Sequence, residues 1–303
     1  MISFLVPVYR SADSLPELYD RLSVEFDNLA GGFELIFIED CGGDRSWEVI
    51  NSLAANDKRV RGLRMSRNYG QHNALLCGIR EARGETIVTL DDDLQHPPEE
   101  VTKLLSKLND GFDVVYGPPE QEQHGLLRDL ASKITKFALQ GAMGTANARQ
   151  VSALRVFRTS LREAFADYRC PTVNIDVLLT WATTNFTAVQ VKHEPRKFGE
   201  SGYTVKKLMA HALNMVTGFS TRPLQLASLM GFSFGIFGVI ILAYVLTQWI
   251  IVGSAVPGFA FLASIITIFS GAQLLALGVI GEYLARMHFR TMERPPYLIR
   301  EKL

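Results

Sequence analysis

Residues 86 to 98 read Thr86-Ile87-Val88-Thr89-Leu90-Asp91-Asp92-Asp93-Leu94-Gln95-His96-Pro97-Pro98. The first five are apolar or β-branched, as is typical of a buried strand, and two prolines close the stretch. Three carboxylates are therefore expected at the carboxyl end of one strand, where open α/β folds bind ligands. Oxygen ligands of this kind suit Mg²⁺ or Mn²⁺ and, through the metal, a diphosphate. The alternative is a solvated acidic turn that caps a helix beginning near Pro97.

Strand-like and helical patterns alternate along the chain around this stretch. Such alternation predicts a Rossmann-like α/β fold, with a mostly parallel sheet and helices on both of its faces. Helical patterns cover residues 15–29, 46–56 and 73–82. The strands are predicted at Ile2 to Val8, Phe33 to Glu39, Val60 to Met65, Thr86 to Leu90 and Asp113 to Tyr116. The residues that follow the first four strands should line one edge of the sheet, where a nucleotide would lie.

Asp40 follows the second predicted strand, in the turn Glu39-Asp40-Cys41-Gly42-Gly43-Asp44. Taken alone, it is equally well explained as a turn residue. Together with Asp91 at an equivalent strand end, it is a candidate partner for the base or ribose of a nucleotide. The sequence contains neither Gly-x-Gly-x-x-Gly nor a Walker-type loop, which excludes the common dinucleotide-binding and NTPase classes. The phosphates must then meet a metal or basic side chains.

The hydrophobic residues of the 303-residue chain are concentrated toward its carboxyl end. No Asp, Glu, Lys, Arg or His occurs from Pro223 to Gly281, which leaves room for two membrane-spanning helices. We expect them at 226–252 and 259–283, joined by a turn at 253–258; a helical pair buried in a soluble core is the alternative. The connecting loop is uncharged, so the positive-inside rule predicts that both ends and the α/β domain face the cytoplasm at the inner membrane. The flanking basic residues are Lys206, Lys207, Arg222, Arg286, Arg290 and Arg294.

Other composition features exclude some functions. The formal net charge is zero, which offers no electrostatic case for a nucleic-acid partner. The three cysteines show neither metal-ligand spacing nor a disulfide pattern. Gly231, Gly235 and Gly238 form a small-residue face that suits packing within the hairpin or between subunits of a homo-oligomer.

Several motifs occur in a fixed order. They are Val6-Pro7-Val8-Tyr9, Glu39-Asp40, Arg67-Asn68-Tyr69-Gly70-Gln71-His72, Asp91 to Pro98, Arg196 to Tyr203 and the apolar hairpin. With these motifs the sequence resembles the inverting family-two glycosyltransferases of the GT-A type. It is most similar to the polyprenyl-phosphate glycosyltransferases, which include dolichol-phosphate mannose synthases, bactoprenol glucosyltransferases and undecaprenyl-phosphate aminoarabinose transferases.

The resemblance implies roles for particular residues. Asp91 and Asp93 are the implied catalytic residues, and Asp93 and Gln95 are implied to hold Mg²⁺ or Mn²⁺. The implied donor site consists of Pro7, Tyr9, Asp40, Asn68, Gly70, Asp91 and Asp92. Two departures from the family pattern stand out. Tyr9-Arg10-Ser11 lacks the Asn-Glu that often follows the Tyr, and Asp92 stands where a small residue is common.

The acceptor chemistry follows from charge. A lipid monophosphate, with a second pKa of about 6, is mostly dianionic at neutral pH and needs no general base. It needs a cationic site instead. Arg128 and Ser132 lie four residues apart on a predicted helix over 126–137, hence on one face, with a solvated helix face as the alternative. Arg196, Ser201 and Lys206 are further candidates, in a glycine-rich segment whose alternative is a flexible linker. We expect His72 and His96 to bond loops rather than act as bases.

The segment from 203 to 223 has apolar residues at helical spacing, with Lys206 and Lys207 off the stripe. This pattern predicts an amphipathic juxtamembrane helix that lies on the leaflet, although a helix packed on the sheet has the same pattern. We thus divide the chain into a catalytic domain (1–202), a juxtamembrane segment (203–223), a transmembrane hairpin (224–285) and a cytoplasmic tail (286–303).

The sequence predicts a membrane glycosyltransferase that moves one sugar, expected to be UDP-linked, to a polyprenyl phosphate such as undecaprenyl phosphate, with inversion, for modification of cell-envelope lipid or glycan. A transferase acting on another acceptor hydroxyl and a non-enzymatic membrane adaptor are the alternatives. A processive polysaccharide synthase is disfavoured because it needs more membrane helices and a Gln-x-x-Arg-Trp motif, which this sequence lacks.

Overall fold

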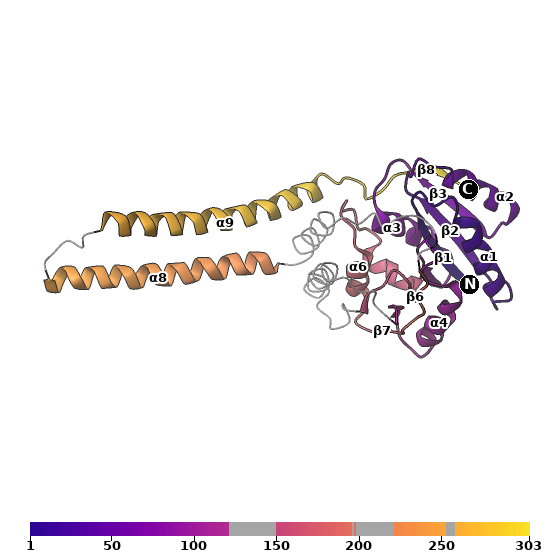
Figure 1. The fold of residues 1–303 in the computed structure, drawn as a ribbon, viewed down its shortest axis with the longest axis horizontal. Helices are drawn as coiled ribbons and strands as arrows, with labels where there is room; N and C mark the ends of the chain where they lie inside the picture. The colour runs from indigo at the N-terminus through magenta and orange to yellow at the C-terminus, as the bar shows by residue number, and fades with distance from the viewer. Residues whose placement is uncertain (121–149, 196, 198–220, 253–257) are drawn as a thin grey trace.

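A computed structural model describes residues 1–303 except 121–149, 196, 198–220 and 253–257. The described residues form an α/β unit and a long helical hairpin that projects from it (Figure 1). The predicted juxtamembrane helix falls almost entirely in the undescribed range 198–220.

The centre of the sheet is parallel. β1 (Ile2–Val8) pairs with β2 (Phe33–Glu39) and with β4 (Thr86–Thr89), and β2 pairs with β3 (Val60–Met65). Every residue of β1 and β2 is buried, because the strands of a parallel sheet are covered on both faces. The strands predicted from the sequence are therefore confirmed to within a residue at each end.

Four further strands widen the sheet to the order β7-β5-β6-β4-β1-β2-β3-β8. β6 (Arg155–Arg158) runs antiparallel between β4 and β5 (Val114–Tyr116), and β7 (Phe186–Ala188) is parallel to β5. β8 (Ile299–Lys302) lies antiparallel to β3 at the other edge. The sheet is mostly parallel around the predicted ligand edge and mixed on both sides of it.

Helices cover both faces of the sheet. α1 (Leu15–Phe26), α2 (Ser46–Asn56) and α4 (Val101–Asn109) pack on one face with Phe4 and Val6, whereas α3 (Gln71–Glu81) and α6 (Ile175–Ala182) pack on the other with Leu5. The alternation of β1 side chains between the two clusters is the two-residue period of a strand. Short 3-10 helices, η1 (Pro98–Glu100) and η3 (Thr159–Phe165), complete the unit. α1 ends at Phe26 rather than 29, because Leu29 donates its N–H to the carbonyl of Phe26 in a turn.

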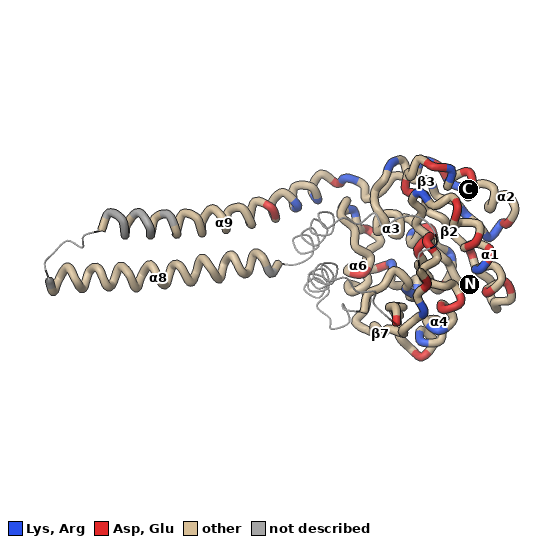
Figure 2. The backbone as a smooth tube through the Cα atoms, in the orientation of Figure 1, with Lys and Arg blue, Asp and Glu red and all other residues tan. Residues whose placement is uncertain are grey.

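The hairpin consists of α8 (Arg222–Val252) and α9 (Phe259–Thr291), which lie side by side and antiparallel (Figure 1). Phe234 packs edge to face on Phe269 with ring centroids 5.5 Å apart. Segments Pro223–Ile251 and Ile268–Thr291 are long and apolar enough to cross a membrane, and neither is covered by protein. Figure 2 shows charged residues along the part of α9 nearest the α/β unit, and α8 begins at Arg222.

The chain after the hairpin does not stay outside the sheet. α9 continues to Thr291, and β8 then adds residues of the predicted tail to the edge of the sheet beside β3 (Figure 1). The predicted tail, 286–303, therefore includes part of a helix and one strand of the α/β unit.

Candidate active site

The carboxyl ends of β1, β2, β3 and β4 meet at one edge of the sheet, and hydrogen bonds join the loops that leave them. The backbone N–H of Tyr9, just after β1, donates to Oδ2 of Asp92, just after β4, at 3.1 Å. Pro7 is buried in β1, while the Tyr9 side chain is 46% exposed. Asp92 thus ties two neighbouring strand ends together.

Asp40 organises the loop that follows β3. Its buried carboxylate accepts the backbone N–H groups of Tyr69 and Gly70, both at 2.7 Å. Burial raises the pKa of Asp40, against the opposing effect of these two hydrogen bonds. Both carboxylate oxygens therefore hold the loop over 66–70, which we call the β3 loop. A direct contact of Asp40 with a base or ribose stays a prediction.

The β3 loop leads into α3 at the same edge. Gly70 has φ of 94°, a conformation that favours glycine, and Asn68 beside it is exposed. Gln71, the first residue of α3, donates from Nε2 to Oδ1 of Asp91 at 2.6 Å. We call residues 91–95 the acidic turn. Gln71 therefore brings the predicted donor residues of the β3 loop next to those of the acidic turn.

The acidic turn is built around Leu94. The Leu94 side chain is buried in the core, and its backbone has a φ of 59°. Beside it, the Asp93 carboxylate accepts the backbone N–H of Gln95 at 3.1 Å. Arg10 and Cys41, which follow β1 and β2, also have positive φ, at 58° and 54°. Such conformations cost energy outside glycine and cluster at functional sites. Three of them lie at this one edge.

The donor set fits a hard divalent metal such as Mg²⁺ or Mn²⁺. In the described part of the chain, no three or more His, Cys, Asp or Glu side chains are grouped so as to hold a metal. Mg²⁺ is usually held by one or two carboxylates, completed by water and substrate phosphates, so it does not need such a group. The hard oxygens of Asp93 and Gln95 fit that arrangement and stay the predicted ligands.

The two histidines of the motifs contact the start of α6 and a loop, respectively. His72 accepts the backbone N–H of Ile175 at Nδ1, with a distance of 3.3 Å. His96 lies 3.4 Å from the Ser152 hydroxyl and packs edge to face on His193. Burial lowers the pKa of His96 to about 4. These contacts agree with the expectation that the two side chains position loops rather than act as bases.

Sequence reasoning missed a buried cluster behind the acidic turn. Asp176, on α6, accepts from Nη1 of Arg155 at 2.7 Å and from the hydroxyl of Tyr116 at 3.1 Å. Arg155 pairs in the sheet with Thr89, two residues before Asp91. The only signal in the sequence is an arginine within the apolar run Leu154-Arg155-Val156-Phe157, and its partner lies 21 residues away.

The predicted acceptor residues Arg128, Ser132, Arg196, Ser201 and Lys206 lie outside the described residues. The chain that leads into the last three is anchored at the acidic turn. Glu194 donates its backbone N–H to the carbonyl of Gln95 at 2.9 Å, and its side chain pairs with Arg21, which also pairs with Glu99 at 2.8 Å. Lys197 pairs with Glu17 of α1 at 2.6 Å.

Comparisons with known proteins agree with this architecture. The family model for glycosyl transferase family 2 matches residues 3–165. An undecaprenyl-phosphate 4-deoxy-4-formamido-L-arabinose transferase of Pseudomonas aeruginosa (strain LESB58) is 34% identical over 302 residues, covering 99% of this chain and 89% of the relative. The transferase of the same description from Salmonella choleraesuis (strain SC-B67) is 32% identical over 308 residues, covering 99% and 93%.

Solved structures share the fold. Glucosyl-3-phosphoglycerate synthase from Mycobacterium tuberculosis superposes with a TM-score of 0.54 at 16% identity, covering 72% of this chain and 77% of that one. The GT-A-like fold is therefore shared at low sequence identity. By its family match and its likeness to the arabinose transferases along almost its whole length, this chain belongs to glycosyltransferase family 2.

Proposed function

We propose that the protein transfers one sugar from a nucleotide sugar, expected to be UDP-linked, to the phosphate of a polyprenyl carrier such as undecaprenyl phosphate. The observation that carries the proposal is the joining of two features in one chain. The acidic turn with Asp91 and Asp93 lies at the carboxyl edge of a family-two sheet, and the same chain carries a long apolar helical hairpin whose residues 223–281 include no Asp, Glu, Lys, Arg or His. Such an enzyme takes its donor from water and its acceptor from the bilayer.

The donor half of the proposal rests on the edge formed by the β3 loop and the acidic turn. Tyr9, Asn68 and Gly70 surround this edge, while Asp40 and Asp92 hold its loops in place. The Mycobacterium tuberculosis synthase was crystallised in complex with Mn²⁺ and uridine diphosphate, which supports a metal and a UDP donor for this chain. Asp93 and Gln95 would hold the divalent metal, which would supply the Lewis acidity that neutralises a departing diphosphate.

The transfer is a single displacement. An oxygen of the lipid phosphate attacks the anomeric carbon from the side opposite the diphosphate, a new carbon–oxygen bond forms, and the nucleoside diphosphate leaves with the electrons of the broken bond. The configuration at that carbon inverts. No carboxylate is needed as a covalent nucleophile, and the dianionic phosphate needs no general base.

The acceptor half rests on the hairpin and on the relatives. The arabinose transferases that match the whole chain are named for undecaprenyl phosphate, which supports the same carrier here. The predicted phosphate ligands are Arg128, Ser132, Arg196, Ser201 and Lys206. The basic residues near both ends of the hairpin support a cytoplasmic catalytic unit at the inner membrane. A homo-oligomer packed through the glycines of α8 stays a prediction.

Transfer of radiolabelled sugar in membranes that contain the protein tests this proposal. The donors form a panel of UDP- and GDP-sugars that includes UDP-4-deoxy-4-formamido-L-arabinose, and the acceptor is undecaprenyl phosphate with Mn²⁺ or Mg²⁺. We expect lipid-soluble label from one donor, lost with a chelator and in Asp93→Asn. Asp110→Asn, at the carboxyl end of α4, is the matched control and should keep full activity.

Other outcomes point to the alternatives. Metal-dependent nucleotide binding without lipid label from any donor would indicate a different acceptor. Absence of both nucleotide binding and transfer would indicate a membrane adaptor.

A further inference from the structure

The chain that returns from the hairpin lies directly against the β3 loop. The carbonyl of Leu298 accepts the backbone N–H of Ser66, the first residue of that loop, at 2.9 Å. β8 then continues alongside β3, with Ile299 opposite Met65. We call residues 296–303 the returning segment. The β3 loop is therefore held at Ser66 by the returning segment and at Tyr69 and Gly70 by Asp40.

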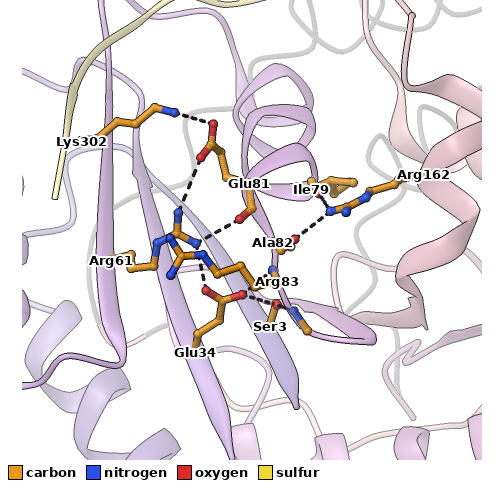
Figure 3. Close-up of polar contacts among 10 residues, drawn as sticks. Ser3, Glu34, Arg61, Ile79, Glu81, Ala82, Arg83, Arg162 and Lys302 are labelled. Atoms are coloured by element: carbon orange, nitrogen blue, oxygen red, sulfur yellow. Dashed lines mark hydrogen bonds and ion pairs between the residues drawn. The ribbon is translucent and has the colours of Figure 1, made fainter.

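The returning segment contacts α3 near both ends of that helix. At the start of α3, the Asn73 amide nitrogen donates to the carbonyl of Pro296 at 2.6 Å. At its end, Lys302 pairs with Glu81 at 2.6 Å, in a polar network that continues to Arg61 and Glu34 (Figure 3). The first contact lies within three residues of Gly70, whereas the second lies at the opposite end of the helix.

Asn73 joins three segments of the chain at one point. Its side-chain nitrogen also donates to the carbonyl of Pro171, at 2.9 Å, in the segment before α6. Asn73 is 6% exposed, and its amide nitrogen donates in both contacts, of which the one to Pro296 is buried and the one to Pro171 is partly buried. A side chain without these donors would leave the two carbonyls without their Asn73 partner, and the returning segment would lose its contact with the start of α3.

We propose that Asn73 is a positioning residue for the donor site. By fixing the returning segment to the start of α3, it keeps the β3 loop in the geometry in which Tyr69 and Gly70 donate to Asp40 and Gln71 reaches Asp91. The end of the hairpin is thereby coupled to the donor site. The catalytic consequence rests on the proposed function, whereas the structural coupling does not.

Hydrogen exchange of the full-length protein in micelles tests the coupling without any substrate. In Asn73→Ala, peptides over residues 66–72 should exchange roughly tenfold faster, because two hydrogen bonds that hold the loop's surroundings are lost. Asn73→Ser, which keeps one donor, should fall between. Lys302→Gln breaks the contact at the far end of α3 and is the matched control, with unchanged exchange at 66–72.

Unchanged exchange at 66–72 in Asn73→Ala, or equal acceleration in Lys302→Gln, would overturn the proposal. If Asn73→Ala exchanges faster throughout the α/β unit, the test is made with Asn73→Ser instead. Unchanged exchange at 66–72 in that variant would then overturn the proposal.

Steady-state transfer gives the second readout. Asn73→Ala should raise the KM for the donor about tenfold, while kcat and the KM for the lipid stay within about twofold of wild type. A fall in kcat with an unchanged donor KM would contradict a positioning role at the donor site. If the wild-type protein transfers no sugar but the exchange pattern holds, the proposed function fails and the coupling stands.

Discussion

The backbone N–H of Tyr9 donates to the carboxylate of Asp92 at 3.1 Å, across the ends of two neighbouring strands. Asp92 is the residue of the acidic turn that departs from the family pattern, and this contact gives it a structural role. Burial raises its pKa. A neutral side chain that accepts the same hydrogen bond should therefore serve almost as well as the carboxylate.

We predict that Asp92→Asn keeps transfer activity within about threefold of wild type, because the asparagine carbonyl still accepts the N–H of Tyr9. Asp92→Leu removes the acceptor and should lower kcat/KM for the donor by roughly tenfold. Steady-state kinetics with both variants and with Asp93→Asn check this. An Asp92→Asn variant as inactive as Asp93→Asn would show instead that the Asp92 charge acts directly on metal or donor.

For Asp40, in contrast to Asp92, we predict that an amide side chain does not replace the carboxylate. Both of its oxygens accept backbone N–H groups of the β3 loop, and asparagine has only one oxygen to offer. Asp40→Asn turns an amide N–H toward another N–H, which should cost about 1–3 kcal/mol and reduce kcat/KM for the donor by roughly 5- to 150-fold.

The matched control is Asp44→Asn in the same turn, which touches Ser46 and Ala12 but not the β3 loop. Equal losses in the two variants would indicate a general effect on the turn rather than on the β3 loop.

The amino-terminal edge of the sheet carries a stability prediction. Glu34 is buried and accepts from Ser3 and the backbone N–H of Arg83, both at 2.6 Å, and from Arg61 at 2.9 Å (Figure 3). Burial alone would raise the pKa of Glu34, but these hydrogen bonds outweigh it and lower the pKa below the ordinary 4.5. A lowered folded-state pKa stabilises the fold above the unfolded-state value, and this stabilisation is lost as the pH falls through the folded-state pKa.

We therefore expect Glu34→Gln to lower the free energy of unfolding by about 2 kcal/mol at neutral pH, the value of a hydrogen bond to a charged group, and to lower the melting temperature by roughly 4–8 °C. The difference from wild type should shrink on acidification below about pH 4. Thermal unfolding in micelles measures it, with the exposed Glu25→Gln as control. A difference that does not change between pH 7 and pH 3 would contradict the assigned role of the charge.

The sequence predicts the strands at the centre of the fold because each of them is a continuous, mostly apolar run. Phe33 to Glu39 is a run of seven residues buried on both faces, and such a run is visible without knowledge of its partners. β6 contains Arg155, and β8 is largely charged, Ile299-Arg300-Glu301-Lys302. Both are strands only because of distant partners, Asp176 and β4 for the first and β3 for the second.

The candidate site also has parts that the sequence predicts and parts that depend on distant partners. The acidic turn and the motif residues are predicted because each lies next to a recognisable strand end. The contacts that arrange them are not, since Asp40 meets Gly70 across 30 positions and Asn73 meets Pro296 across 223. Only the folded chain brings these residues together.

A single displacement onto a lipid phosphate determines both the linkage and the anomeric configuration of the product. With the donor identified by transfer, we would determine the linkage and anomeric configuration of the purified lipid product by phosphorus and proton NMR. We expect one sugar joined through a phosphodiester to the polyprenyl chain, with the configuration opposite to that of the donor. A product with retained configuration, or with the sugar on a hydroxyl rather than on phosphate, would contradict it.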